Sequence, residues 1–372
     1  MKISKNNIFS VLKLIKINTH NLTTPTQTSI TNPNPKNLTT PTQTSLTINK
    51  TVLSGIRATG SLHLGNYLGA IKGMLQLQKD PLYKCYFMVA DVHSITTPYD
   101  PTLLKQFRTQ VVKDYLAAGL DPNKSTIFIQ SQVPTHLEMS FYISSLVSVA
   151  RMQHLPTYKE KVKQYPENLS MALLNYPVLM SADILAYKAT HVPVGKDQEP
   201  HLEVTRQIAR NINEKYNLNF PEPQIFSTES NYVPSLLGEG KMSKSIEGSY
   251  INLTDSLQQI QEKVAKIPTD IGHGKVFPKD NPQINSLFEF IKVFIGEQAV
   301  YDYKEQYVKS GIRYGDLKKQ LSSKIFEMLQ PIQQKRLTIS QDFINDVLNH
   351  GQKVALQITT KNVNEIKDKM GF

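Results

Sequence analysis

The chain has 372 residues, enough for two domains, and its hydrophobic content of 40% can supply sizeable buried cores. Its one cysteine, Cys85, excludes an internal disulfide bond and a zinc site built from cysteines, and no apolar run approaches the roughly 20 residues of a membrane-spanning helix. The net charge of +11 is compatible with an RNA partner without indicating one, because six lysines and no acidic residue lie in residues 1–50, which leaves +5 for the rest.

The first 50 residues differ in composition from the rest of the chain. NLTTPTQTSIT at 21–31 returns as NLTTPTQTSLT at 37–47, a polar tandem repeat that we expect to be disordered. Ahead of the repeat, lysines are interspersed with five apolar residues that fall roughly on one helical face: Ile3, Ile8, Val11, Leu12 and Ile15. A basic, acid-free, amphipathic start resembles a mitochondrial presequence, although this one lacks arginine. We therefore predict a location in the mitochondrial matrix; the alternative is a low-complexity extension on a cytoplasmic protein.

From Thr51 onward, short apolar strands alternate with helical patterns. The expected strands are 52–56, 85–90 and 125–130, and the expected helices are 63–78, about 100–118 and about 136–150. This alternation predicts an α/β fold with a doubly wound, Rossmann-like parallel sheet over residues 51–250. Ligands of such a sheet bind beyond the carboxyl ends of its strands.

After about residue 254 the strand signals fade. Residues 256–267, 284–295, 315–337 and the last twenty residues have helical periodicity. We therefore predict a helical second domain over residues 251–372.

The first expected strand turns into a helix at His-Leu-Gly-Asn, residues 63–66. A helix N-terminus offers free N–H groups and the positive end of the helix dipole, so it attracts phosphate. Gly65 would let a nucleotide lie close to the backbone, and His63 and Asn66 can both donate hydrogen bonds to phosphate oxygens. Alone the signal is weak, because a histidine near an ordinary strand-to-helix turn is common.

A glycine-flanked basic loop stands at 241–245, Lys-Met-Ser-Lys-Ser, after Gly238 and Gly240. Two lysines that bracket hydroxyl groups suit the clamping of a triphosphate whose pyrophosphate is about to leave. An ordinary basic loop is the alternative, but five fixed positions are hard to match by accident. The two motifs, in this order, resemble the signatures of class I aminoacyl-tRNA synthetases. That family joins a doubly wound nucleotide-binding domain to a helical anticodon-binding domain.

The resemblance covers nearly all of residues 52–340 and is to bacterial and mitochondrial tryptophanyl-tRNA synthetases. Four stretches carry it: SGIRATGSLHLGNYLGAI at 54–71, NYPVLMSADILAY at 175–187, VPVGKDQEPHLEVTR at 192–206 and LQPIQ at 329–333. It implies ATP-dependent activation of L-tryptophan and its transfer to tRNA(Trp), with Mg²⁺ bound through ATP and no dedicated metal site. It also implies a homodimer.

The tyrosine enzymes are close relatives and the natural competitor. They usually carry Tyr-x-x-x-Gln-x-x-Asp, where this chain has Tyr176, Met180 and Asp183. Methionine is a soft wall for a large flat ring, and a carboxylate one helical turn away can accept the indole N–H. For Asp183 alone a capping or salt-bridging role is the alternative, and for Met180 alone core packing.

The remaining roles follow from the resemblance, position by position. The tryptophan-binding residues are His93, Tyr176, Met180, Asp183 and Gln198, with Tyr176 and Gln198 at the ammonium group. The ATP-binding residues are Arg57, His63, Gly65, Asn66, Gly195, Lys196, Asp197, Lys241, Met242, Ser243, Lys244 and Ser245. The catalytic contacts to phosphate are His63, Asn66, Lys161, Lys241, Ser243 and Lys244. Many relatives have glutamine where Arg57 stands; arginine keeps the hydrogen-bond donors and adds a positive charge.

Three other interpretations stay open. The first is that the chain charges tyrosine, the second that it is another nucleotidyl transferase with the same motifs, and the third that it is a non-catalytic RNA-binding paralogue. A paralogue of the last kind should have eroded motifs, and both motifs are intact here.

Overall fold

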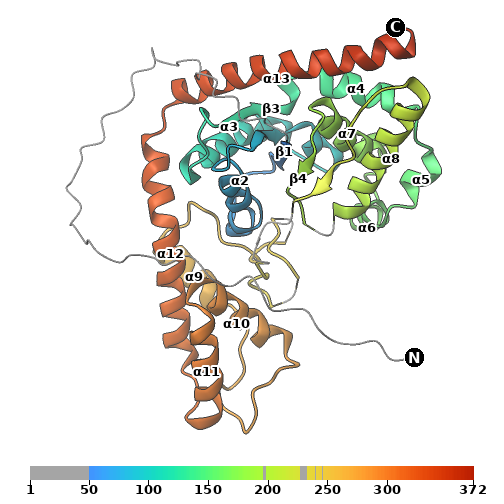
Figure 1. Ribbon diagram of the computed structural model, residues 1–372. Coiled ribbons are helices and arrows are strands. Elements are labelled where there is room, and N and C mark those ends of the chain that lie inside the picture. The colour runs from blue at the N-terminus through green and yellow to red at the C-terminus, as the bar shows by residue number, and fades with distance from the viewer. Residues whose placement is uncertain (1–49, 196–197, 227–232, 239, 245) are drawn as a thin grey trace, which may run out of the picture. The chain divides into compact units, whose positions relative to one another are not determined.

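The computed structural model describes residues 50–195, 198–226, 233–238, 240–244 and 246–372 (Figure 1). The predictions made for the N-terminal extension lie almost wholly outside the described residues. So do three of the predicted ATP-binding residues, Lys196, Asp197 and Ser245.

The strands in the described part of the chain form one parallel sheet in the order β3-β2-β1-β4-β5. They are β1 Lys50–Arg57, β2 Tyr83–Ala90, β3 Ser125–Ile129, β4 His191–Val192 and β5 Gln224–Ile225. The direction in which strands are added reverses at β1, which lies between β2 and β4. At such a switch point the carboxyl ends of neighbouring strands leave a crevice for ligands. The predicted doubly wound sheet is confirmed.

Each face of the sheet has its own core, because successive side chains of a strand point to opposite faces. One face buries Val52, Phe87, Val89 and Ile127 against the helices that follow β1 and β2. The other face buries Leu53, Tyr86, Met88 and Phe128 against the helices that follow β3 and β4. The unbroken apolar run at 85–90 is what a strand buried on both faces requires.

Helices occupy the three ranges expected around the sheet, and further helices lie outside those ranges. They are α1 Leu64–Asn66, η1 Tyr67–Ile71, α2 Lys72–Leu77, η2 Val92–Thr96, α3 Pro101–Ala118, η3 Gln130–Gln132, α4 Thr135–Ser144, α5 Val149–Gln153, α6 Pro156–Gln164, α7 Met171–Ala186 and α8 Glu199–Tyr216. The single helix expected at about 136–150 is divided, since Ser148 caps the start of α5 by accepting from the Arg151 N–H. The strands β4 and β5 have two residues each, too few for an alternating pattern to be recognised.

The C-terminal part of the chain is helical, as predicted. Its helices are α9 Leu257–Ala265, α10 Pro282–Phe294, α11 Glu297–Lys309, α12 Tyr314–Thr338 and α13 Gln341–Met370, of which α11 was not expected. The last helix returns to the sheet and lies beside the edge strand β3 (Figure 1). All described residues belong to one compact unit, and the predicted boundary near residue 250 stays a prediction. Among them, no helix has both the length and the apolar character needed to cross a bilayer.

Candidate active site

Two adjoining cavities open at the carboxyl ends of β1, β2 and β4. The first has a volume of about 510 Å³ and the second about 1480 Å³. Six residues line both: Gly55, Arg57, Thr97, Lys161, Val194 and Gln198. Two ligands in these cavities would therefore meet beside the side chains of Arg57 and Lys161.

The first cavity collects every residue predicted to bind tryptophan. Tyr176, Met180 and Asp183 reach it from α7, where spacings of three and four residues place them on one helical face. His93 reaches it from η2, after β2, and Gln198 from the position before α8. Apolar wall residues complete the inner part of the cavity: Leu53, Met88, Ile184 and Val192.

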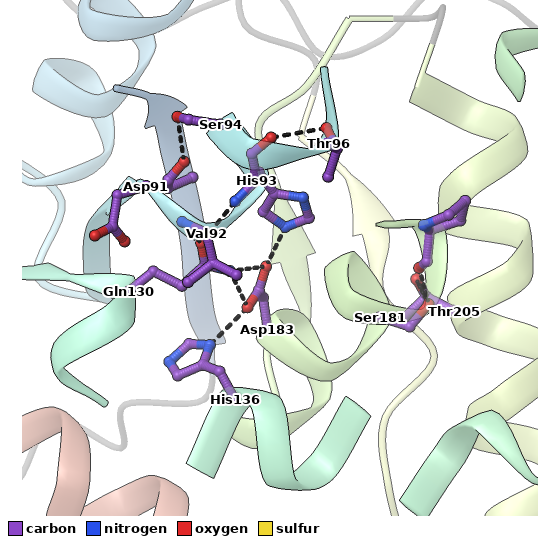
Figure 2. A network of polar contacts seen from close by, with 12 residues as sticks. Asp91, Val92, His93, Ser94, Thr96, Gln130, His136, Ser181, Asp183 and Thr205 are labelled. Carbon is purple, nitrogen blue, oxygen red and sulfur yellow. Dashed lines mark hydrogen bonds and ion pairs between the residues drawn. The ribbon is translucent and has the colours of Figure 1, made fainter. Parts of the chain in front are cut away.

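Asp183 is fully buried at the inner end of this cavity and accepts from three side chains (Figure 2). His93 Nε2 lies 2.7 Å from Oδ2, and His136 Nδ1 lies 2.6 Å from Oδ1. The Gln130 amide nitrogen lies 2.8 Å from Oδ1 and 3.0 Å from Oδ2. Burial alone would raise the pKa of Asp183, but the bonds from His136 and His93 more than offset it and hold the pKa below its ordinary value. The cavity thus ends in an ionised, acceptor-only carboxylate.

Gln130 and His136 were not predicted. Gln130 directly follows β3, so the rule that functional side chains follow the carboxyl ends of strands points to it. His136 lies in the first turn of α4, and its Nε2 is 3.0 Å from the Tyr187 hydroxyl. No local pattern distinguishes His136 from an ordinary core histidine.

The mouth of the first cavity carries polar groups from three helices. Tyr176 Oη lies 2.8 Å from His201 Nε2, and the same nitrogen lies 2.7 Å from Thr157 Oγ1. His201 Nδ1 lies 2.9 Å from Gln198 Oε1. His201 was not predicted, although it follows Gln198 by one helical turn, the spacing at which two helical side chains meet.

The second cavity contains every described residue predicted to bind ATP. These are Arg57, His63, Gly65, Asn66, Gly195, Lys241, Met242, Ser243 and Lys244, and Lys161 lines this cavity as well. The His63 backbone N–H donates to Asn66 Oδ1 at 3.0 Å, so the side-chain oxygen of Asn66 caps the start of the helix. The side-chain N–H₂ group of Asn66 is a hydrogen-bond donor.

Position 65 needs a glycine because neighbouring side chains leave no room for a Cβ atom. A Cβ at this position would lie 2.9 Å from His63 Cε1 and 3.2 Å from Met242 Cβ. A Cβ at Gly60, where φ is +117°, would lie 2.7 Å from Lys244 Nζ. The two predicted phosphate motifs therefore pack directly against each other.

The second motif is anchored by its backbone and by one buried side chain. The Met242 N–H donates to the Val233 carbonyl at 3.2 Å, and the Met242 side chain is buried. The Ser243 N–H donates to Ser249 Oγ at 3.2 Å, while that hydroxyl donates to the Ser243 carbonyl at 2.6 Å. This arrangement presents Lys244 toward the strand-to-helix turn.

Burial among like charges shifts the titration of the cationic groups here. Burial, together with the charge of Lys244, lowers the pKa of His63 to about 4. Burial lowers the pKa of Lys244 to about 8, although the charge of Asp114 acts the other way. Burial and the charge of Arg57 lower the pKa of Lys161. The Nδ1 atom of His63 is buried and has no hydrogen-bond partner among the described residues. A cavity of this kind favours an anion.

Comparison with known proteins agrees with this geometry. A family model described as tRNA synthetases class I (W and Y) matches residues 47–330. The chain belongs to this family. It is 39% identical to a tryptophan–tRNA ligase of Porphyromonas gingivalis over 329 residues, which are 87% of this chain and 99% of that one. It is 38% identical to a tryptophan–tRNA ligase of Rickettsia bellii over 333 residues, with coverage of 87% and 99%.

Solved structures of synthetases share the fold. The tryptophanyl-tRNA synthetase of Mycoplasma pneumoniae matches with a TM-score of 0.75 and 31% identity, covering 87% of this chain and 98% of that one. That of Campylobacter jejuni, complexed with ADP and tryptophan, matches with a TM-score of 0.74 and 29% identity, covering 87% and 100%. The class I synthetase fold and the helical C-terminal part are thereby established.

Proposed function

We propose that this class I synthetase is a tryptophan–tRNA ligase, which forms tryptophanyl-adenylate from tryptophan and ATP and then charges tRNA(Trp). The observation that carries the proposal is the pair of adjoining cavities. One ends in a buried carboxylate beside Met180, and the other holds both phosphate motifs. The tyrosine alternative is not favoured, because Met180 replaces the usual glutamine and the relatives at 35–39% identity are tryptophan ligases.

The inner end of the first cavity suits an indole ring. Tryptophan offers one N–H donor and no acceptor, so an acceptor-only carboxylate complements it. Met180 and Met88 supply sulfur for contact with the ring. A cavity of about 510 Å³ is ample for an amino acid of this size.

The mouth of this cavity suits the zwitterionic end of an amino acid. The cation of Arg57 and the carboxylate of Glu160 both act on the titration of Tyr176, so charges of both signs lie near its hydroxyl. Tyr176 Oη and Gln198 Oε1 are acceptors for an ammonium group. Arg57 and Lys161, at the junction of the two cavities, would attract the substrate carboxylate and the α-phosphate of ATP.

The reaction then needs no protein nucleophile. The tryptophan carboxylate attacks the α-phosphorus, the bond to the β-phosphate oxygen breaks, and pyrophosphate leaves with the electron pair. A hydroxyl of the terminal adenosine of tRNA next attacks the carbonyl carbon and releases AMP. The cations of Lys161 and Lys244 stabilise the charge that develops on the phosphates, and His63, neutral near pH 7, serves as a hydrogen-bond donor.

We propose that Mg²⁺ enters with ATP rather than through a site of its own. The described lining of the second cavity includes a single carboxylate, Glu199, which is already paired with Arg206 at 2.7 Å. The described residues also form no group of three or more His, Cys, Asp or Glu side chains suited to a metal. This donor set fits Mg²⁺ held mainly by phosphate oxygens and water, where it would neutralise phosphate charge.

Charging of tRNA tests the proposed function. The full chain is incubated with ATP, Mg²⁺ and transcripts of tRNA(Trp) and tRNA(Tyr), and with radiolabelled tryptophan or tyrosine. We expect acid-precipitable label with tryptophan alone. Label with tyrosine alone would assign the chain to the competing specificity, and no label with either would favour the RNA-binding paralogue. We also propose that residues 51–250 perform the chemistry and residues 251–372 bind the anticodon.

We infer that the protein works as a homodimer through the surface of α4 and α5. Leu137 and Phe141 lie one turn apart on α4 with 49% and 77% of their surface exposed, and Val149 at the start of α5 is 59% exposed. An apolar strip of this kind on a helix suits a self-complementary interface. Light scattering should give the mass of a dimer, and Phe141→Glu should give a monomer. A wild-type monomer would contradict the inference.

We propose that residues 1–50 direct the protein to the mitochondrial matrix. They carry six lysines and no acidic residue, and the family model begins only at residue 47. A positive leader is drawn across a membrane that is negative inside. Fused to a fluorescent reporter, residues 1–50 should take it to mitochondria, and a protein that starts near Lys50 should charge tRNA normally. A cytosolic reporter would contradict the location and leave the ligase assignment intact.

A further inference from the structure

His201 lies at the centre of the polar mouth of the first cavity. It stands in the first turn of α8 and is 1% exposed. Its two ring nitrogens contact three residues on three segments of the chain: Thr157 on α6, Tyr176 on α7 and Gln198 before α8. Two of these three, Tyr176 and Gln198, are the residues to which the proposed function gives the substrate ammonium group.

The hydrogen-bond chemistry of the ring decides which way the hydroxyl protons point. The carbonyl oxygen of Gln198 only accepts, so the ring nitrogen 2.9 Å away, Nδ1, carries hydrogen. In the neutral ring Nε2 then has only a lone pair. The Tyr176 hydroxyl lies 2.8 Å and the Thr157 hydroxyl 2.7 Å from Nε2, so the two compete for this one lone pair. We take Tyr176 as the donor to Nε2, because Thr157 can instead donate to the Tyr176 oxygen, a hydrogen bond that lowers the pKa of Tyr176.

This arrangement prepares acceptors for a cation. With its proton held by His201, Tyr176 Oη turns lone-pair density away from the ring, toward the cavity that Tyr176 lines. The hydrogen bond from Nδ1 holds the Gln198 amide with its oxygen, an acceptor, on the side of His201. Burial raises the pKa of Tyr176, so the phenol stays protonated and its orientation is set by its partner.

We propose that His201 is a positioning residue that makes the site select an ammonium group, because it fixes the Tyr176 hydroxyl and the Gln198 amide as acceptors. The proposal rests on the proposed function, since it assumes that an amino acid enters the first cavity. His201 acts through its two partners and need not touch the substrate.

Three ligands separate this role from a general effect on the cavity. Tryptophan and tryptamine both carry the ammonium group, whereas indole-3-propionate has the ring and the carboxylate without it. Their affinities for the full-length protein are measured by titration calorimetry. His201→Leu should weaken tryptophan and tryptamine about 10- to 100-fold, the range expected when hydrogen bonds to a charged group are misdirected. Indole-3-propionate should keep its affinity.

Two variants report on the mechanism. His201→Gln places a carbonyl oxygen where Nε2 stands and should recover most of the tryptophan affinity. Tyr176→Phe removes the hydroxyl, and adding His201→Leu to it should cost much less than in the wild type, because the two residues act as one unit. If the His201→Leu variant does not fold, His201→Asn takes its place in these measurements. Asparagine keeps an N–H donor for Gln198 but places no acceptor near the Tyr176 hydroxyl.

Thr205→Val is the matched structural control. Thr205 is buried one turn further along α8, and its hydroxyl donates to the His201 carbonyl at 3.0 Å. The same hydroxyl lies 2.9 Å from Ser181 Oγ (Figure 2). It should lower the melting temperature and leave the three affinities unchanged.

The outcomes that overturn the proposal are distinct. Equal weakening of all three ligands by His201→Leu would make His201 a support of the cavity shape. Unchanged affinities would make its bonds irrelevant to binding. If the wild type itself bound tryptophan no better than indole-3-propionate, the proposed function would fail together with this inference. A wild-type preference for tryptophan that survives in His201→Leu would overturn the inference alone.

Discussion

At the inner end of the tryptophan cavity, Asp183 keeps a negative charge in a fully buried position because three side chains donate to it. Both of its oxygens already carry two contacts, so the carboxylate is well oriented before a substrate arrives. An indole N–H must share or displace one of these donors, and His93, which also lines the cavity, is placed to give way. Orientation and selection of the ring thus depend on the same group.

Asp183→Asn should raise KM for tryptophan at least tenfold and leave the fold intact. The amide would turn an N–H₂ group toward donors from His93, His136 or Gln130, and it would offer the indole a poorer acceptor. The measurement is tryptophan-dependent pyrophosphate exchange. Asp270→Asn is the control, since Asp270 accepts from Tyr307 and Tyr314 in the helical part and should not affect KM. An unchanged KM in Asp183→Asn would remove Asp183 from substrate selection.

Lys244 should impose an alkaline limb on the activity. Its pKa of about 8 means that the free enzyme loses this cation as the pH rises through that value. We expect kcat/KM for ATP to fall above pH 8, because that ratio reports the free enzyme. Lys244→Arg keeps the charge and should move the limb upward even if its plateau is lower, and Lys244→Ala should abolish the limb and lower kcat. A limb that persists in Lys244→Ala would belong to another group.

Among the elements, α13 protects the edge strand of the sheet. Gly351 lets the helix approach β3 so closely that an added methyl group would overlap the carbonyl oxygen of Ile127. Gln352 donates to the Gln132 carbonyl at 2.9 Å, and Thr135 and Thr359 share a buried hydrogen bond of 2.6 Å. The helix thereby covers a strand whose backbone would otherwise be open to another chain.

Gly351→Ala should destabilise the protein by several kcal/mol, because the helix must move off the strand to admit the methyl group. Gly315→Ala, in the first turn of α12 with open space around it, is the control and should be neutral or stabilising by up to about 1 kcal/mol. The measurement is the melting temperature of each variant relative to the wild type. Equal melting temperatures would show that α13 is not seated on β3 as described.

The elements that sequence reasoning found were those with long or regular patterns. The buried strands β1, β2 and β3 and the long helices α3 and α12 carry their periodicity within one segment. Local motifs likewise gave His63 and Lys244. Of the groups that orient Asp183, His136 could not be found in this way, because it lies 47 residues away, and Gln130, 53 residues away, is marked only by its place after β3. Such contacts follow from the packing of α4 and η3 beside α7, which no local spacing encodes.

At the scale of the whole molecule, a part-buried ion pair links the helical part to the phosphate motifs. Arg336 on α12 donates from Nε to Asp114 Oδ1 at 2.7 Å, and Asp114 Oδ2 accepts from the Leu62 N–H at 3.3 Å, next to His63. Asp114 is fully buried on α3, and its charge also acts on Lys244. The position of α12 is therefore coupled to the strand-to-helix turn.

Arg336→Met should destabilise the protein by roughly 3 kcal/mol, because it leaves the Asp114 carboxylate buried without its partner. Asp114→Asn together with Arg336→Met should be less destabilising than the single change, since no unpaired charge remains. Urea unfolding of the two single variants and the double variant measures the coupling. Additive losses would show that the pair does not interact across the two parts.

The most direct test of the account is ATP–pyrophosphate exchange by the full chain with each of the twenty amino acids in turn. Exchange requires only the two cavities and the phosphate motifs, so it is independent of tRNA recognition, dimerisation and cellular location. We expect rapid exchange with tryptophan and rates near background with tyrosine, phenylalanine and the others. Exchange supported by tyrosine instead, or by no amino acid at all, would contradict it.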